Sequence, residues 1–529
     1  MTLKISDNCG SFPQTRRAFL EKFGLVGGSA LVMSAMRSWD LMAQAGPRPV
    51  LSGRTNGTKV VILGAGVSGM TVGYELGKLG YNVKILEARD RVGGVNWTLR
   101  RGATHTELGA GGETQVCNFD EGQYHNGGPW RLAHWQTGVL GYCKELGVPV
   151  EVFINENESS YFYYEGDKLG PLAGKKVRLR EIKADMIGYT SELMAKAINQ
   201  NTLDLPLTAE DKERFVTFLV SEGYLDSADH AYKKTTARGP GDPYDFTALL
   251  QAGFGTRIRS VIEGTGMAPM FQPVGGMDQF PKGFQRKLGD KITFGAEIVS
   301  IHQTNDGVKV AYKNTKTGAM TEVTADYCVS CLPLTILQRL DVNLSPETMA
   351  AVKATPYSPS AKMGLQMKRR FWEEDDKIFG GHMYSNLPVG DVAYPSWNYF
   401  GSKGIMLGFY GNGQMSGLIN MPIKDRIEHV LTHISKVHPQ IRAEYETAYC
   451  TFWEKTQYSL GAFAGGGGGG NDARLATLGK PDGRIYLGCA AVSGNGGWQE
   501  GAVAAAWKQV KQLHETAMTS GATTSKPAA

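Results

Sequence analysis

The 529-residue chain lacks the features that mark several large classes of protein. Its seven cysteines are scattered and odd in number, which argues against a disulfide framework. The net charge of +5 is small for this length and is spread along the chain, so the sequence indicates neither nucleic-acid binding nor polybasic membrane binding. A Gly-x-Ser-x-Gly nucleophile elbow is absent. The remaining composition is that of an ordinary globular protein. The chain is long enough for two or three domains.

Motifs for metal or thiol chemistry are also missing. His429 and His433 are spaced i, i+4 in an expected helix over Lys424–His438, but no His-Glu-x-x-His accompanies them, so we predict no metal site. Cys328 and Cys331 match Cys-x-x-Cys, but they occur in an apolar strand whose alternation sends the two side chains to opposite faces. This pair is therefore interpreted as buried structure.

The chain has no apolar run long enough to cross a bilayer, which takes about 20 residues. The run Phe23–Met36 falls short of this, and it lies between Arg16-Arg17 and the Ala43-Gln44-Ala45 sequence. A twin arginine, a short apolar segment and an A-x-A site in this order predict a twin-arginine export signal over residues 1–45. We therefore expect a periplasmic or secreted protein whose fold begins after residue 45.

The most informative segment that is present follows this signal. Lys59–Leu63 reads as a buried parallel strand, and Gly64, Gly66 and Gly69 follow it in Gly-x-Gly-x-x-Gly spacing at the start of an expected helix. A second apolar strand, Asn82–Leu86, ends at Glu87. The full strand–turn–helix–strand–acid unit predicts dinucleotide binding.

Each part of this unit has a physical role. Gly64 permits the tight turn, Gly66 lets the backbone approach a pyrophosphate, and Gly69 lets helix and strand pack closely. The helix N-terminus then points its N–H groups at the phosphates. Glu87 stands where a carboxylate can accept a hydrogen bond from the adenosine ribose. The sequence thus predicts an ADP-binding unit.

The rest of the chain divides by pattern. Residues 180–198 and 209–225 place apolar side chains at helical spacing, with Thr208 and Asp211 as a helix start. Residues 292–312 alternate as strands around a turn at Asn305–Gly307. The six glycines from Gly465 to Gly470 predict a flexible loop, and residues 516–529 predict a disordered tail.

Several segments resemble the flavin amine oxidase family, and in particular its bacterial L-amino-acid oxidases. The resemblance begins at Ala88–Gly94 (ARDRVGG), where an arginine and a glycine pair follow the ribose acid, and this extension favours FAD over NAD. Further matching segments occur in the family's order over most of residues 59–515, at Glu113–Asp120, Tyr124–Trp135, Phe271–Asp278, Ser360–Trp372, Gly380–Ser396, Tyr458–Ala464 and Gly496–Ala502.

The resemblance implies an α/β plus α+β fold of the glutathione-reductase type. We expect a Rossmann-like FAD-binding domain in residues 46–100, 272–356 and 480–515, interleaved with a mixed-sheet substrate domain in residues 101–174 and 357–479. Residues 175–271 would form a helical subdomain. The family resemblance leaves the oligomeric state open, with a homodimer as one alternative.

The same resemblance assigns roles to individual residues. Arg131 falls on the arginine that binds the substrate carboxylate, for which a guanidinium fork is well shaped. Tyr394 falls on a tyrosine that shares this contact, although an ordinary half-buried strand aromatic would read the same way. The catalytic residue would be Lys362, which the family keeps near the flavin N5, and Gly497 and Trp498 would meet the substrate amine and wall the site.

The implied cofactor is FAD, bound without a covalent link because the flavin-linking cysteine of monoamine oxidases falls at Ala462. The residues expected to hold FAD come from the two glycine turns, the ribose acid and two later segments. They are Gly64, Gly66, Ser68, Gly69, Glu87, Ala88, Arg89, Arg91, Gly93, Gly94, Val299 and Trp498.

The chain departs from the family at the cofactor. Val95 replaces the arginine that usually follows the glycine pair, and Cys489, Ala490 and Ala491 replace a Gly-Glu-His that contacts the flavin. Losing each charge-assisted contact costs about 1.5–3 kcal/mol of affinity.

Three functions therefore stay open. The first is oxidation of an L-amino acid by O2 to a 2-oxo acid, ammonia and hydrogen peroxide. The second is a related oxidase or monooxygenase that acts on another amine or decarboxylates its amino acid to an amide. The third is a flavin-poor homologue that serves as a partner subunit.

Overall fold

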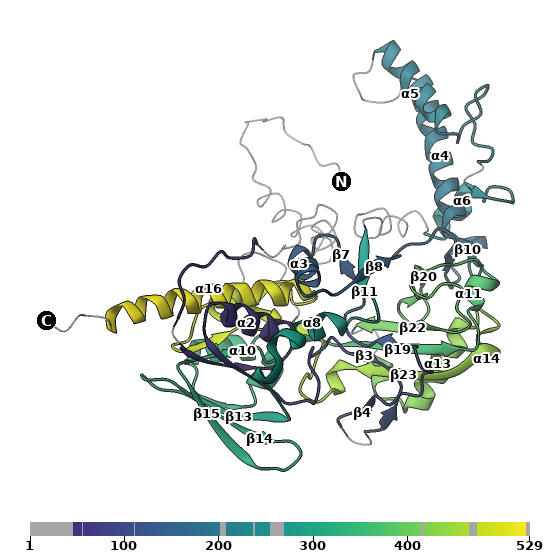
Figure 1. Cartoon of the computed structure of the whole chain (residues 1–529). Helices are drawn as coiled ribbons and strands as arrows, with labels where there is room; N and C mark the ends of the chain where they lie inside the picture. The colour runs from purple at the N-terminus through teal and green to yellow at the C-terminus, as the bar shows by residue number, and fades with distance from the viewer. Residues whose placement is uncertain are drawn as a thin grey trace, which may run out of the picture.

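A computed structural model describes residues 46–55, 57–109, 112–200, 208–235, 238–253, 269–412, 416–464 and 473–524 (Figure 1). The predicted export signal over residues 1–45 and the glycine run 465–470 lie outside the described residues.

A five-stranded parallel sheet organises the first part of the structure, in the order β12-β2-β1-β16-β25. Its strands are β1 (Lys59–Leu63), β2 (Asn82–Glu87), β12 (Ile292–Phe294), β16 (Tyr327–Ser330) and β25 (Ile485–Leu487). The middle strands are apolar on both sides because both faces of the sheet are covered. Val60 and Ile62 belong to one core cluster, whereas Val61 and Leu63 belong to another.

Three helices cover the first face: α2 (Val67–Lys78), α8 (Gln279–Leu288) and α16 (Gln499–Thr524). The second face packs on an antiparallel hairpin that continues into a four-stranded sheet, β15-β14-β13-β17. These strands are β13 (Ala296–Gln303), β14 (Val308–Asn314), β15 (Met320–Ala325) and β17 (Asp341–Val342), and the turn predicted at Asn305–Gly307 joins the first two.

A second, mixed sheet has seven strands in the order β10-β9-β20-β21-β22-β19-β23. The strands are β9 (Tyr161–Tyr163), β10 (Val177–Arg178), β19 (Ser360–Met367), β20 (His382–Ser385), β21 (Val392–Ala393), β22 (Gly404–Asn412) and β23 (Tyr445–Phe452). One face packs against α13 (Ile423–Ile434) in a cluster that includes Met363, Phe409 and Val392. The opposite face of this sheet borders the candidate site.

Shorter elements complete the structure. A three-stranded sheet joins β7 (Leu132–Ala133), β11 (Met270–Pro273) and β8 (Val150–Phe153). Two-stranded pairs are β3 (Thr98–Leu99) with β6 (His125–Asn126), β4 (Thr104–Thr106) with β5 (Thr114–Val116), and β18 (Tyr357–Ser358) with β24 (Phe463–Ala464). The remaining α-helices are α3 (Thr137–Glu145), α9 (Leu334–Leu337), α10 (Pro346–Lys353), α11 (Phe371–Glu374), α12 (Ser416–Ile419), α14 (Ile441–Glu444) and α15 (Ala473–Leu478).

The predicted helical region forms α4 (Leu179–Asn199), α5 (Ala209–Ser221) and α6 (Phe246–Gln251), and Figure 1 shows α4 and α5 rising away from the rest of the molecule. Thr208 caps α5 by accepting a hydrogen bond from the backbone N–H of Asp211 at 3.1 Å, which confirms the predicted helix start. A buried ion pair joins Arg238 to Asp185 on α4 at 2.8 Å.

This arrangement confirms the predicted α/β plus α+β fold, with a Rossmann-like unit beside a mixed-sheet unit. The C-terminal tail needs a correction, because α16 continues to Thr524 instead of ending before residue 516. Its extension has packing partners: Ala517 is buried, and the Met518 sulfur would lie 3.1 Å from a Cβ placed on Gly53.

In the part of the chain that the structure describes, no helix combines the length and apolar character needed to cross a membrane. Within the same ranges, no group of three or more His, Cys, Asp or Glu side chains is arranged to hold a metal ion. The His429 ring instead lies 2.9 Å from the Pro388 carbonyl oxygen.

Candidate cofactor and substrate site

A cavity of about 530 Å³ runs from the carboxyl ends of the parallel sheet to the seven-stranded sheet. Its walls come from both glycine turns, the ends of β2 and β13, residues 457–464, residues 489–491 and residues 496–499, with Lys362 at the seven-stranded sheet. The crevice at the carboxyl ends of parallel strands is the usual ligand position in such folds.

The first glycine turn leaves space on the cavity side. Gly64 has a φ of +94°, and a Cβ on Gly69 would lie 1.9 Å from the Gly64 carbonyl oxygen, so both glycines are required by the backbone itself. A Cβ on Gly66 would meet nothing within 4 Å. The N-terminus of α2 has neither a side-chain cap nor an acidic residue in its first turn, which leaves its N–H groups available to an anion.

The second glycine turn lies directly against the first. Gly93 and Gly94 both have positive φ, and the Gly93 N–H donates to the Ala65 carbonyl oxygen at 2.8 Å. A Cβ on Gly94 would lie 3.4 Å from the Cα of Gly66. Arg91 donates to the Gly94 carbonyl oxygen at 2.7 Å and stacks over Trp97, so it braces this turn and does not line the cavity.

Glu87 and Arg89 define the adenosine end. The buried Glu87 carboxylate accepts one hydrogen bond on each oxygen, from the Ala65 N–H at 2.7 Å and the Arg89 N–H at 2.9 Å. Each oxygen keeps a second lone pair for a ribose hydroxyl. Ala88 and Arg89 also line the cavity, and the Arg89 guanidinium donates to the Ser459 hydroxyl at 2.9 Å.

The cavity wall contains Ile298 and not the expected residue, Val299. The pairing of β13 with β14 shifts register between Ile298 and Ser300, which leaves Val299 as the extra residue of a β-bulge. Val299 is 40% exposed and is not part of the cavity wall, whereas Ile298 is. The bulge shifts which side chains of the strand face the cavity. A sequence pattern does not reveal such a bulge.

Lys362 occupies the other end of the cavity. Its side chain is 3% exposed, its Nζ donates to the Gly128 carbonyl oxygen, and the same atom lies 4.4 Å from the Tyr410 ring centroid. Burial, together with the charge of Arg131, lowers the pKa of Lys362 far below its ordinary value. A buried amine that loses its charge readily is suited to hydrogen-bond and proton-transfer chemistry.

Arg131 lies on the loop that leads into β7, beside Trp130. The ring of Trp130 meets Phe153 and His382 edge-on at 5.0 and 5.1 Å, and the Arg131 guanidinium lies 5.6 Å from the Trp130 centroid. Arg131 does not line the cavity itself. Its charge nevertheless reaches Lys362. Burial, together with the charge of Arg131, lowers the pKa of His382 to about 3.

Tyr394 points away from this region, which corrects the predicted carboxylate contact. It is fully buried in the cluster beneath α13, and its hydroxyl lies 2.7 Å from His438 Nε2. His438 Nδ1 in turn lies 3.0 Å from an Asp376 carboxylate oxygen. Strand alternation is the reason, because Val392 and Tyr394 share the core-facing side of the chain there. The alternative of an ordinary strand aromatic describes this residue, although it is fully buried and not half-buried.

Gly497 and Trp498 line the cavity just before α16. Trp498 meets Trp135 edge-on at 5.2 Å. The positions that depart from the family, Val95, Cys489 and Ala490, also line the cavity and offer it no charge.

Two polar residues that the sequence analysis missed, Asn96 and Gln499, supply part of the polar character that these departures remove from the cavity. Asn96 donates to the Gln499 side chain at 2.6 Å, both residues line the cavity, and Asn96 Oδ1 is buried with no hydrogen-bond partner among the described residues. Their positions directly after the glycine pair and after Gly497-Trp498 were the available signal. The glycine cradle, the ribose acid and this unpaired acceptor together fit FAD.

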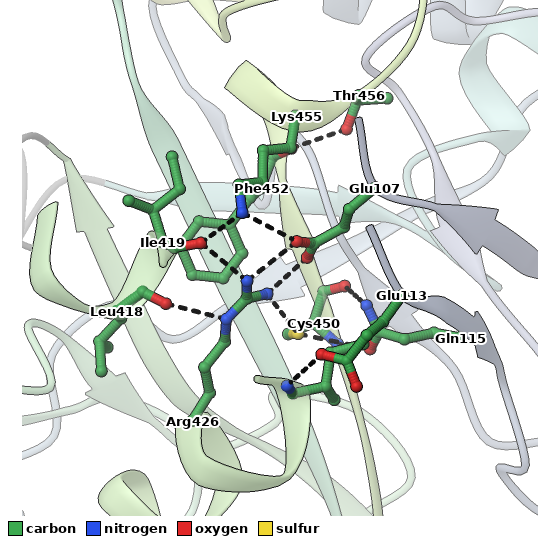
Figure 2. A network of polar contacts seen from close by, with 11 residues as sticks. Glu107, Glu113, Gln115, Leu418, Ile419, Arg426, Cys450, Phe452, Lys455 and Thr456 are labelled. Atoms are coloured by element: carbon green, nitrogen blue, oxygen red, sulfur yellow. Dashed lines mark hydrogen bonds and ion pairs between the residues drawn. The ribbon is translucent and has the colours of Figure 1, made fainter. Parts of the chain in front are cut away.

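A buried ion pair holds one wall of the cavity (Figure 2). Arg426 on α13 grips the Glu107 carboxylate with two N–H groups, one of them at 2.9 Å, and Lys455 lies 3.5 Å from the same carboxylate. Arg426 also donates to the Leu418 carbonyl oxygen at 2.9 Å. The next residue, Leu108, lines the cavity and donates its N–H to the Lys455 carbonyl oxygen.

Sequence comparison relates the chain to flavin-containing amine oxidoreductases. Residues 67–514 match the family model described as flavin containing amine oxidoreductase. The chain is 27% identical over 433 residues to L-amino acid oxidase Bs29 of Bothriechis schlegelii, which spans 79% of this chain and 81% of that protein. It is 25% identical over 456 residues to an L-amino-acid oxidase of Notechis scutatus scutatus, with 83% of each chain covered.

Two solved structures share the fold. A putrescine oxidase bound to putrescine superposes with a TM-score of 0.57 at 19% identity, covering 88% of this chain and 99% of that one. Cyclohexylamine oxidase from Brevibacterium oxydans IH-35A gives a TM-score of 0.58 at 17% identity, covering 87% and 100%. At these identities the likeness concerns the fold.

Proposed function

The chain belongs to the flavin-containing amine oxidoreductase family, and from this premise we propose that it deaminates an L-amino acid to a 2-oxo acid, ammonia and hydrogen peroxide. That it is a flavin-dependent oxidoreductase acting on amines or amino acids follows from the family and from its relatives. The identity of the substrate is the part that we propose.

The observation that carries the proposal is that the charge of Arg131 reaches Lys362 at one end of the cavity. A guanidinium near this end suits a substrate that carries a carboxylate, because it can bind the carboxylate in a bidentate fork. A simple amine has no group for such a partner. The L-amino-acid oxidases among the relatives support the same substrate class.

In this proposal the protein contributes mainly position and solvent exclusion. Arg131 binds the substrate carboxylate, the Gly497 carbonyl oxygen accepts a hydrogen bond from the substrate amine, and the Trp498–Trp135 pair keeps water away. Lys362, held by the Gly128 carbonyl, presents Nζ at the same end of the cavity and can hold a proton there. FAD, when bound, supplies the hydride acceptor and the reaction with O2.

We further propose that FAD is held without a covalent bond, because Ala462 lines the cavity where a linking cysteine would stand. We also propose export through the twin-arginine route, supported by the pattern of residues 1–45. The domain boundaries given above remain part of the proposal, and the assembly of the protein stays open.

A specific observation favours each alternative. The fold neighbours named for putrescine and cyclohexylamine favour an enzyme that oxidises simple amines. Val95, Cys489 and Ala490 favour a protein that binds flavin poorly.

A product assay tests the proposal. The protein without residues 1–45 is incubated in air with a panel of L-amino acids, their D-enantiomers and simple amines, and peroxide, 2-oxo acid and amide are quantified. We expect equal amounts of peroxide and 2-oxo acid from at least one L-amino acid. Peroxide from simple amines alone, or an amide as the main product, would contradict the proposed reaction.

A further inference from the structure

We propose that Asp391 makes this enzyme selective for L-amino acids whose side chain carries a positive charge, such as an ammonium or guanidinium group. The inference rests on the proposed amino-acid oxidation, and it names the substrate class of that same site. It assigns to Asp391 the task of binding the far end of the substrate while Arg131 binds the carboxylate.

The side chain of Asp391 lies on the cavity-facing side of the seven-stranded sheet, beside the cavity wall but not part of it. It directly precedes β21, whose first residue, Val392, belongs to the core cluster on the opposite face. Because neighbouring strand residues alternate, Asp391 faces the other way. Lys362 and Tyr410 occupy this same face on β19 and β22, where they are register partners, and both line the cavity.

The backbone places Asp391 beside this part of the cavity wall. Its N–H donates to the Tyr410 carbonyl oxygen at 2.9 Å. The pairing of His382 with Ala393 and of Met383 with Val392 makes Tyr384 the next residue across from Asp391. The carboxylate is therefore flanked by Tyr410 on one neighbouring strand and by Tyr384 on the other.

Among the residues that the structure describes, none donates a hydrogen bond to the Asp391 side chain, which is exposed. The protein around it is nevertheless dense enough that desolvation raises its pKa, against the lowering effect of Arg131 and Lys362. An accessible acid in a dense surrounding is what a cleft-facing group shows, and a bound cation would relieve its desolvation.

The neighbouring groups add to a preference for a cation. Tyr384 and Tyr410 present aromatic rings, which attract ammonium and guanidinium groups through their π faces. Desolvation by burial raises the pKa of Tyr384, and the nearby acids Glu156 and Asp391 raise it further, so a second acid lies in the same region. A substrate with a neutral side chain would leave the Asp391 carboxylate without a partner, and an acidic one would repel it.

The test compares matched substrates in the flavin-loaded wild-type enzyme. L-Lysine is paired with L-norleucine, and L-arginine with L-citrulline, so that charge changes with little change in length. We expect kcat/KM to favour the charged member of each pair by about tenfold or more, which corresponds to about 1.4 kcal/mol. A preference for the neutral members would overturn the inference, while their oxidation would still uphold amino-acid oxidation.

Variants then locate the source of the preference. Asp391→Asn should reduce both ratios to near unity, chiefly through KM of the charged substrates, and Asp391→Glu should retain a preference. Asp306→Asn, in the exposed turn between β13 and β14, is the matched control and should leave the ratios unchanged. Unchanged ratios in Asp391→Asn would overturn the assignment. If no L-amino acid is oxidised at all, the proposed function itself fails.

Discussion

The hydroxyl of Tyr394 lies 2.7 Å from Nε2 of His438, inside the packed core between the seven-stranded sheet and α13. This contact separates Tyr394 from the substrate region, although its sequence position suggests a substrate contact. It also leaves Arg131 as the predicted carboxylate ligand whose surroundings support that role.

Replacing Tyr394 by phenylalanine should therefore affect stability and not substrate binding. The buried His438 nitrogen would lose its partner, which costs about 1–3 kcal/mol. We expect a lower Tm with KM for the best amino acid unchanged. A large increase in KM at unchanged Tm would contradict this prediction and show that Tyr394 contributes to substrate binding.

Replacing Arg131 by alanine should weaken binding of amino acids. Loss of a charge-assisted contact of about 1.5–3 kcal/mol predicts a rise in KM of roughly 10- to 100-fold, with a smaller effect on kcat. Arg131→Lys should recover part of the loss, because it keeps the charge without the fork. Steady-state kinetics check this, and an unchanged KM in Arg131→Ala would refute the carboxylate role.

Lys362→Met should inactivate the enzyme while making the fold more stable. The wild-type lysine has a pKa well below its unfolded value, so the unfolded state binds more protons in the window between the two values, and stability rises with pH there. Methionine removes this slope. We expect the Tm advantage of Lys362→Met at neutral pH to shrink as pH approaches about 10.4, the ordinary lysine value.

The control for this experiment is Lys309→Met, an exposed lysine on β14, which should keep both activity and the pH dependence of Tm. A lower Tm in Lys362→Met than in the wild type at neutral pH would show that Lys362 is a stabilising cation, which contradicts a lowered pKa for this buried amine.

Alanine substitutions in the first glycine turn should separate cofactor binding from folding. Gly66 has a φ of −71° and open space at its Cβ position, so Gly66→Ala should fold normally yet hinder a phosphate. Gly69→Ala would place a Cβ 1.9 Å from the Gly64 carbonyl oxygen and should destabilise the fold. Flavin content and Tm of the two variants check this; equal flavin content in Gly66→Ala and wild type would contradict the cradle.

Breaking the Glu107–Arg426 pair should destabilise the cavity wall. Glu107→Gln keeps the size but leaves a buried guanidinium uncompensated, which costs about 3–5 kcal/mol. The exposed pair Lys309–Glu322 is the matched control, and Glu322→Gln should cost about 0–1 kcal/mol. Thermal unfolding measures both, and equal Tm shifts would show that the buried pair carries no special stability.

Local patterns were enough to predict the dinucleotide unit. The turns at Gly64 and Gly93 and the acid at Glu87 act within one continuous segment, so spacing alone specifies their geometry. The α5 start at Thr208 was predictable for the same reason, because an N-cap and its target lie three residues apart.

The substrate end depends on features that a single sequence does not show. A β-bulge keeps Val299 out of the cavity wall. Tyr394 faces the core because of the register of its strand, which depends on long-range pairing. Asn96 and Gln499 meet across 403 positions of sequence. Asp391 is brought beside Tyr410 by sheet pairing, so nothing near it in the chain marks its place.

The most direct test of the central claim is an anaerobic titration of the protein without residues 1–45. The account predicts a yellow protein whose flavin absorbance bleaches on addition of an L-amino acid and returns when O2 is admitted, with a 2-oxo acid as product. A colourless protein, or one that bleaches only with simple amines, would contradict it.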